Sequence, residues 1–147
     1  MKARTGKALA HIHRDYAESF VVEAGEATAK VDGRTVRLSP GETLTVEADE
    51  SHVNPYNAGG ADLVMRHIFE PLSDFAAGYV ERLGYVMRAG RADRQGELPV
   101  SAAFAIAHAT DSQTFAKGVP PAVQRGLLAP VGARIARLRG VQLYLPV

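Results

Sequence analysis

Between Ala8 and about Phe69, apolar and polar positions alternate, and turn residues interrupt the alternation at short intervals. Runs such as Thr28–Val31 and Thr35–Leu38 have the period of two that puts one face of a strand on a core. Asp32-Gly33 separates these two runs and is a strong signal for a hairpin turn. Short strands at this spacing predict an antiparallel sandwich or barrel.

Beyond Glu70-Pro71 the apolar residues recur at helical spacing instead. Ser73-Asp74 is typical of a helix start, and Gly90 of its end. The alanine-rich stretch Pro99–Ala109 predicts a short buried helix. A last helix is expected from Pro121 to Gly140, with a kink at Pro130. Five apolar residues form one stripe along it: Val123, Leu127, Val131, Ile135 and Leu138.

A shift in charge accompanies this change of pattern. Residues 1–70 carry 8 Lys/Arg and 11 Asp/Glu, a balance of −3, whereas residues 71–147 carry 9 and 5, a balance of +4. We therefore expect a β domain over residues 1–70 and a helical extension over residues 71–147. The extension is expected to pack on the β domain or to form the interface of a homodimer, although its arginines and apolar stripe would also suit a membrane-surface anchor.

Composition narrows the class of protein. With 46% hydrophobic and 22% charged residues, the 147-residue chain is not a disordered one. The absence of cysteine excludes disulfides, thiolate metal sites and cysteine nucleophiles, and fits a cytoplasmic location. A net charge of +1 gives no case for nucleic-acid binding, and no apolar run is long enough for a transmembrane segment or a signal peptide.

Without cysteine, a metal site must use His, Asp and Glu side chains. His11 and His13 are two residues apart, so both rings lie on the same face of a strand. Glu18 follows after a segment able to reverse the chain, and a hairpin would bring it across from the histidine pair. His52 follows the strand of another hairpin, opened by Pro40-Gly41.

These residues resemble the two motifs of the cupin family. His11, His13, Glu18 and Gly25 match the first motif, which is HxH, four residues, Glu, six residues and Gly. The second motif is similar to Pro40-Gly41, His52 and a nearby Asn, although Tyr56 stands where the family usually has the Asn. The resemblance covers roughly residues 6–70, under half of the chain.

The resemblance implies a jelly-roll β-barrel that holds one divalent metal ion, with His11, His13, Glu18 and His52 as ligands. Three imidazoles and one carboxylate suit Fe, Mn, Ni, Co or Zn and leave up to two positions open on a six-coordinate ion. Cupins normally have one or two strands more before the first motif. We therefore expect that the barrel is open, that another subunit supplies the missing strand, or that the chain is shortened relative to its relatives.

Other polar residues are expected near the barrel mouth. His67 and Tyr16 are candidates for catalysis, with a hydrogen-bonded histidine at a sheet edge as the alternative for His67. Arg66 is a candidate for binding a substrate carboxylate, and the alternative is that it is a solvated surface arginine. Three more candidates for substrate binding are Asn54, Tyr56 and Asn57. The alternative is that the residues of this segment only form an ordinary turn.

The function implied by the resemblance is a metal-dependent enzyme acting on a small organic molecule, with oxygenase chemistry ranked ahead of isomerase or lyase chemistry. The alternative is a non-catalytic module that binds a metal or a small molecule and uses its helices for assembly.

Overall fold

The computed structural model describes residues 1–2, 7–72, 74–91, 98–110 and 113–143. The chain divides into two compact units. The first unit is Met1–Pro71 together with Arg94–Glu97, and the second is Leu72–Asp93 together with Leu98–Val147.

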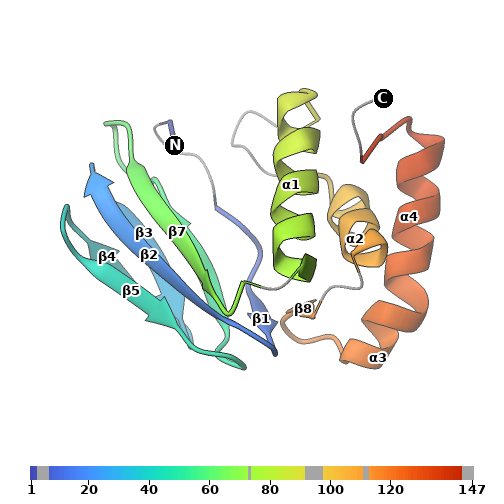
Figure 1. Cartoon of the computed structure of the whole chain (residues 1–147), viewed down its shortest axis with the longest axis horizontal. Coiled ribbons are helices and arrows are strands. Elements are labelled where there is room, and N and C mark those ends of the chain that lie inside the picture. The colour runs from blue at the N-terminus through green and yellow to red at the C-terminus, as the bar shows by residue number, and fades with distance from the viewer. Residues whose placement is uncertain (3–6, 73, 92–97, 111–112, 144–147) are drawn as a thin grey trace. The chain divides into compact units, whose positions relative to one another are not determined.

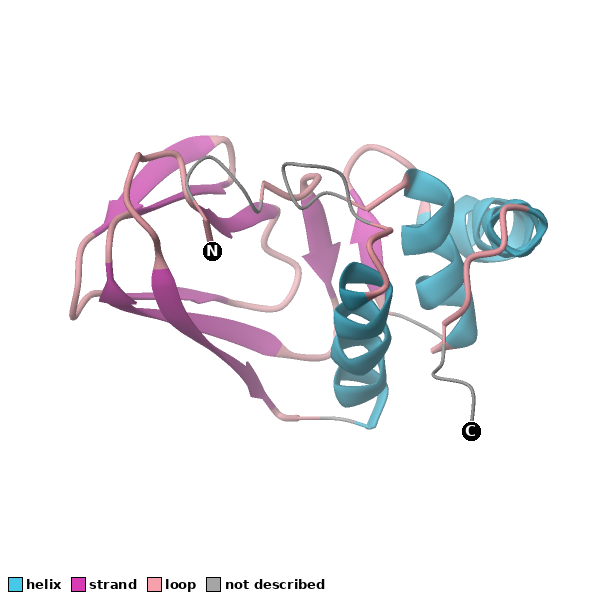
Figure 2. Ribbon diagram, turned by 90° about the horizontal axis from the view of Figure 1, so that it is seen from above, coloured by secondary structure: helices cyan, strands magenta, loops and turns pink. Residues whose placement is uncertain are grey.

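The first unit is built from antiparallel strands (Figure 1). They are β1 (His11–His13), β2 (Ala17–Ala24), β3 (Ala27–Val31), β4 (Arg34–Leu38), β5 (Thr43–Val46), β6 (His52–Tyr56) and β7 (Val64–Glu70). One sheet has the order β4-β3-β6-β1 and the other the order β5-β2-β7. Figure 2 shows the strands of this unit in two separate layers. The prediction of antiparallel β-structure followed by helices is confirmed, whereas closure of the two sheets into one barrel stays a prediction.

Two turns show why these residues form these strands. Asp32 and Gly33 both have positive φ, 47° and 81°, as a tight two-residue hairpin turn between β3 and β4 requires. Gly25 follows β2 with φ 78°, and a Cβ there would collide with the carbonyl oxygen of Asp62. The glycine of the first motif therefore permits a close backbone approach.

The core of the first unit draws on both sheets. Val22 from β2 packs with Ala27 and Leu38, which belong to β3 and β4, and with Leu63. Burial alternates along β2, so the face that carries Val22 also carries Phe20 and Glu18. Strand alternation thus places one carboxylate among apolar side chains.

The second unit is mainly helical. Its elements are α1 (Asp74–Arg88), α2 (Val100–Ala109), the short strand β8 (Thr114–Ala116), α3 (Pro121–Val123), the π-helical turn η1 (Gln124–Leu128) and α4 (Ala129–Leu138). The three predicted helical regions are therefore present. Instead of an α-helix kinked at Pro130, the last region contains a π turn just before that proline, which has no N–H to continue the ladder. None of the described helices has the length and apolar character needed to cross a bilayer.

Helix α4 packs through small residues. Ala129, Gly132 and Ala136 are its buried positions. A Cβ on Gly132 would lie 2.5 Å from Cβ of Phe104, which belongs to α2, so the two helices approach closely. The large apolar residues of the predicted stripe lie on the opposite, exposed side.

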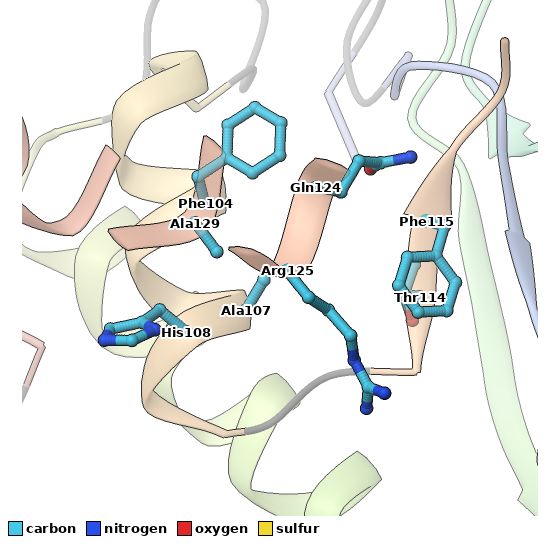
Figure 3. A pocket seen from close by; sticks show the side chains of 8 residues that line it. All are labelled: Phe104, Ala107, His108, Thr114, Phe115, Gln124, Arg125 and Ala129. Atoms are coloured by element: carbon cyan, nitrogen blue, oxygen red, sulfur yellow. The ribbon is translucent and has the colours of Figure 1, made fainter. Parts of the chain in front are cut away.

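A cavity of about 60 Å³ lies within the second unit (Figure 3). Gln124 is one of the residues that line it, and Oε1 of its buried amide accepts a hydrogen bond from the backbone N–H of Ala116 at 2.8 Å. The same amide donates to the carbonyls of Ala116 at 2.9 Å and Val119 at 2.7 Å. Gln124 therefore joins β8 to η1.

Candidate metal centre

The four predicted ligands come from three strands of the first unit. His11 and His13 lie on β1, Glu18 on β2 and His52 on β6. His11 pairs directly with His52 across the β1–β6 ladder, so their side chains share a face. The HxH spacing brings His13 to that face as well.

The ligand atoms of these residues converge. One nitrogen or oxygen from each lies within 4.8 Å of the others. The Oε2 atom of Glu18 is 3.2 Å from Nε2 of His13 and 3.4 Å from Nε2 of His52. The rings of His11 and His52 have centroids 4.3 Å apart. Four donor atoms at this spacing can surround a single ion.

Backbone carbonyls orient two of the rings. Nδ1–H of His11 donates to the carbonyl of Leu9 at 2.8 Å, and Nδ1–H of His52 donates to the carbonyl of Glu50 at 3.0 Å. Each ring therefore keeps its Nε2 lone pair for another partner. Metal-binding histidines have this arrangement, in which the second ring nitrogen is held by a carbonyl or carboxylate.

The site buries polar atoms that lack ordinary partners. The side chains of His13, Glu18 and His52 are at most 4% exposed. Among the described residues, both ring nitrogens of His13, Oε2 of Glu18 and Nε2 of His52 have no hydrogen-bond partner. Leaving such groups unsatisfied costs about 1–3 kcal/mol each. A divalent cation would satisfy Oε2 of Glu18, Nε2 of His52 and one ring nitrogen of His13 together. The residues present therefore fit a metal ion.

Charge favours the same conclusion. Burial acts to raise the pKa of Glu18, but the close approach of His13, His52 and His67 outweighs it and holds that pKa well below the usual range. Burial, followed by the neighbouring His52, lowers the pKa of His11 to about 4. Burial also acts to lower the pKa of His52, yet contact with Glu18 and with the backbone of Glu50 raises it overall. At neutral pH the site thus contains a carboxylate and a neutral His11, which are the forms that bind a metal.

His67 contacts the second oxygen of Glu18. It lies on β7 opposite Phe20, and its Nε2 is 3.3 Å from Oε1 of Glu18. Its ring stacks on Phe20, with centroids 4.3 Å apart, and lies 4.1 Å from the ring of Phe69. With its side chain 30% exposed, His67 is more accessible than Glu18. Alternation along a strand lets only one of the neighbours Arg66 and His67 face the site, and the structure places His67 there.

Arg66 takes part in a surface ion pair. Its Nε lies 3.4 Å from Oε1 of Glu23, and its side chain is 63% exposed. Such a pair contributes little to stability. Its expected role in substrate binding stays a prediction.

The remaining candidates differ in their surroundings. Tyr16 is buried and stacks on the ring of His13, with centroids 4.3 Å apart and planes 15° from parallel. Asn54 shares β6 with His52, and its buried Oδ1 has no hydrogen-bond partner among the described residues. Tyr56 is half-buried on the same strand, with Nζ of Lys7 5.7 Å from its ring centroid. Their roles in catalysis and substrate binding stay predictions.

Asn57 is hydrogen-bonded to backbone groups of its own loop and of Met1. Its Nδ2 donates to the carbonyls of Ala61 at 2.7 Å and Met1 at 3.2 Å, and its Oδ1 accepts from the N–H of Gly59 at 3.0 Å. These bonds are the turn chemistry noted in the sequence, and the expected role of Asn57 in substrate binding stays a prediction.

Sequence reasoning missed Phe20 and Phe69, which frame His67. The signal available was the alternation of β2, which puts Phe20 on the same face as Glu18, but the pairing of β2 with β7 was needed to bring His67 between the two rings.

Residues 1–69 match the family model described as Cupin domain, Cupin_2. These residues form a domain of the cupin superfamily. The family assignment from the two motifs is thereby confirmed, and the cluster of His11, His13, Glu18 and His52 is compatible with a metal ion.

Several solved structures are similar to this cupin domain. KdgF from a Halomonas species is 24% identical, with 49% of this chain and 64% of that chain covered and a TM-score of 0.42. A protein of Thermotoga maritima described as a predicted oxalate decarboxylase is 22% identical, with coverages of 46% and 57% and a TM-score of 0.42. A cupin protein of Bacteroides fragilis is 19% identical, with coverages of 50% and 64% and a TM-score of 0.41. Less than two thirds of each of these chains is spanned, and no curated protein matches.

Proposed function

We propose that this protein binds one divalent transition-metal ion through His11, His13, Glu18 and His52 and acts as a metal-dependent enzyme on a small organic molecule. The observation that carries the proposal is the convergence of three imidazoles and one carboxylate. Three of the four side chains, His13, Glu18 and His52, are buried and have polar atoms that lack hydrogen-bond partners among the described residues. This ligand set suits Fe, Mn, Ni, Co or Zn. Such an ion, when bound, supplies Lewis-acid polarisation or, if redox-active, chemistry with O₂.

The chain's own residues prepare the site for that ion. The carbonyls of Leu9 and Glu50 hold the rings of His11 and His52 with Nε2 available. Stacking on Tyr16 restricts the ring of His13, so we assign Tyr16 to positioning this ligand. Glu18 contributes the negative charge, and its two oxygens are divided between the histidine ligands and His67.

His67 is the candidate for proton transfer. When its Nε2–H donates to Oε1 of Glu18, the lone pair of its Nδ1 is free to accept a proton from a molecule bound at the site and later to return it. Its partial exposure gives such a molecule access, which the buried ligands do not. Asn54 and Tyr56, at alternate positions of β6 after His52, would contact hydroxyl or carbonyl groups of that molecule.

For the fold we infer a jelly roll in which the sheets β4-β3-β6-β1 and β5-β2-β7 are the two walls. The shared core of Val22, Ala27 and Leu38 supports this, because it takes side chains from both sheets. Oxygenase, isomerase and lyase chemistry are all compatible with the ligand set. We rank oxygenase chemistry first, as in the interpretation of the sequence.

Metal analysis of the purified protein tests the proposal. We expect about one Fe, Mn, Ni, Co or Zn ion per chain, lost in His11→Ala and His52→Ala. His108→Ala is the matched control, because this exposed histidine lies on α2, in the other unit, and should leave the metal content unchanged. A wild-type protein with no metal and no affinity for added Fe(II), Mn(II) or Zn(II) would refute the metal site.

Turnover distinguishes an enzyme from a non-catalytic binding module. Small carbonyl and catechol-like compounds should be screened with and without O₂ against the metal-loaded wild type and His67→Gln. An enzyme should lose about 10²–10⁴-fold in rate in His67→Gln while it keeps its metal. Metal retention without turnover on any compound would favour the binding module.

A further inference from the structure

The helical run α3–η1–α4 carries a row of large apolar side chains on its exposed side. This row, here named the outer stripe, consists of Val123, Leu127, Val131, Ile135 and Leu138. All five are exposed, from 38% for Ile135 to 80% for Leu138. Their spacing of four, four, four and three residues keeps them on one side of the helical run.

The outer stripe is not a core face that has lost its partner. The same run already packs through the small buried residues Ala129, Gly132 and Ala136, against Phe104. A helix that buries small residues and exposes large apolar ones reverses the usual amphipathic arrangement. Exposed apolar patches of this kind mark interaction sites.

Positive charge borders the outer stripe. The exposed Arg134 is three residues after Val131 and four before Leu138, and Arg137 follows one turn later. These arginines and Leu138 line a groove of about 520 Å³ together with His108, Pro130 and Ala133. Residues 113–147 contain five Lys/Arg and no Asp/Glu.

The positive charge beside the outer stripe distinguishes between the possible partners of this face. A second copy docked on this face across a two-fold axis would set arginines against arginines, with no Asp or Glu side chain in residues 113–147 to pair with them. An anionic lipid surface matches both features, because the outer stripe would enter the boundary between headgroups and acyl chains while the arginines bind phosphate groups.

We propose that the outer stripe and its bordering arginines bind this protein reversibly to an anionic membrane surface. The groove between His108 and Arg137 would take a lipid headgroup phosphate, and the helix would lie in the plane of the interface. The proposal uses only residues of the second unit and does not depend on the metal site.

Co-sedimentation with vesicles tests it. The full chain is mixed with vesicles of phosphatidylcholine alone and of phosphatidylcholine with phosphatidylglycerol. We expect binding to the anionic vesicles at least about tenfold tighter than to the neutral ones, weakened by added salt. Arg134→Glu/Arg137→Glu should lose at least about tenfold in binding, and Val131→Asp/Leu138→Asp a similar factor.

Matched variants keep the test specific. Arg34→Glu/Arg37→Glu changes net charge equally through exposed arginines of β4, and Leu72→Asp alters an exposed leucine outside the outer stripe. Both should bind anionic vesicles as the wild type does, and circular dichroism should show all variants folded.

Three outcomes would overturn the proposal. One is a failure of the wild type to prefer anionic over neutral vesicles. Another is equal loss of binding in Arg34→Glu/Arg37→Glu. The third is a dimer in light scattering that Val131→Asp/Leu138→Asp dissociates without any vesicle binding by the wild type, which would assign the outer stripe to a second copy. A metal site that fails its own test would leave these results unaffected.

Discussion

The two units of this protein depart from ordinary burial in opposite directions. The first unit encloses polar atoms of His13, Glu18 and His52 without hydrogen-bond partners among the described residues, whereas the second unit exposes the apolar outer stripe. Buried unsatisfied polar groups cost stability, and exposed patches of large apolar residues mark interaction sites. Each departure is where we propose a partner from outside the chain. The first unit would bind a cation, and the second would bind an anionic membrane surface.

The largest expected effect is at the buried carboxylate. Glu18→Ala removes the only negatively charged member of the proposed ligand set, so metal affinity should fall by more than about a hundredfold. Titration of the metal against a competing chelator measures this. In thermal unfolding, saturating metal should stabilise the wild type by about 2.7 kcal/mol at a hundredfold excess over Kd and leave Glu18→Ala unchanged. Equal stabilisation of both proteins would show that the metal binds elsewhere.

A smaller effect is expected at His67. His67→Phe keeps the stack with Phe20 but loses the contact to Oε1 of Glu18, so metal affinity should drop by roughly 10–100-fold. His67→Gln, which can still donate to that oxygen, should recover part of the loss. The same chelator competition decides, and unchanged affinity in His67→Phe would mean that His67 does not orient the carboxylate.

The packing of α4 offers a third test. Gly132→Ala puts a Cβ 2.5 Å from Cβ of Phe104 and should lower the free energy of unfolding by about 1–3 kcal/mol. Gly126→Ala on the same helical run meets no atom within 4 Å and should be neutral or stabilise by up to about 1 kcal/mol. Urea unfolding compares the two variants. If they behave alike, the small residues are not the packing face.

The smallest effect is expected on the outer stripe. Leu138→Asp at a side chain 80% exposed should change the free energy of unfolding by no more than about 0.5 kcal/mol in the absence of vesicles. Urea unfolding measures it, with Ile106→Ala as the contrasting variant, because truncating that fully buried residue should cost about 2–5 kcal/mol. A large loss in Leu138→Asp would mean that the outer stripe is part of a core.

Features that depend on neighbouring residues could be predicted from the sequence. Asp32-Gly33 predicted its hairpin because the positive φ of a tight turn is a local demand. The HxH spacing predicted that His11 and His13 share a face because side chains alternate along any strand. The cupin assignment and the helices predicted beyond Pro71 are also confirmed, because motif spacing and apolar periodicity can be read directly along the chain.

Tertiary structure decided what alternation and periodicity leave open. Two faces of β7 were defined by its sequence, but only its register with β2, which pairs Phe20 with His67, showed that His67 and not Arg66 reaches Glu18. The apolar row of the last helix was equally visible in the sequence. Its exposure was not, because the close approach of Gly132 to Phe104 gives the buried face to the small residues. A sequence defines the faces of an element, and the partners available in the fold determine which face is buried.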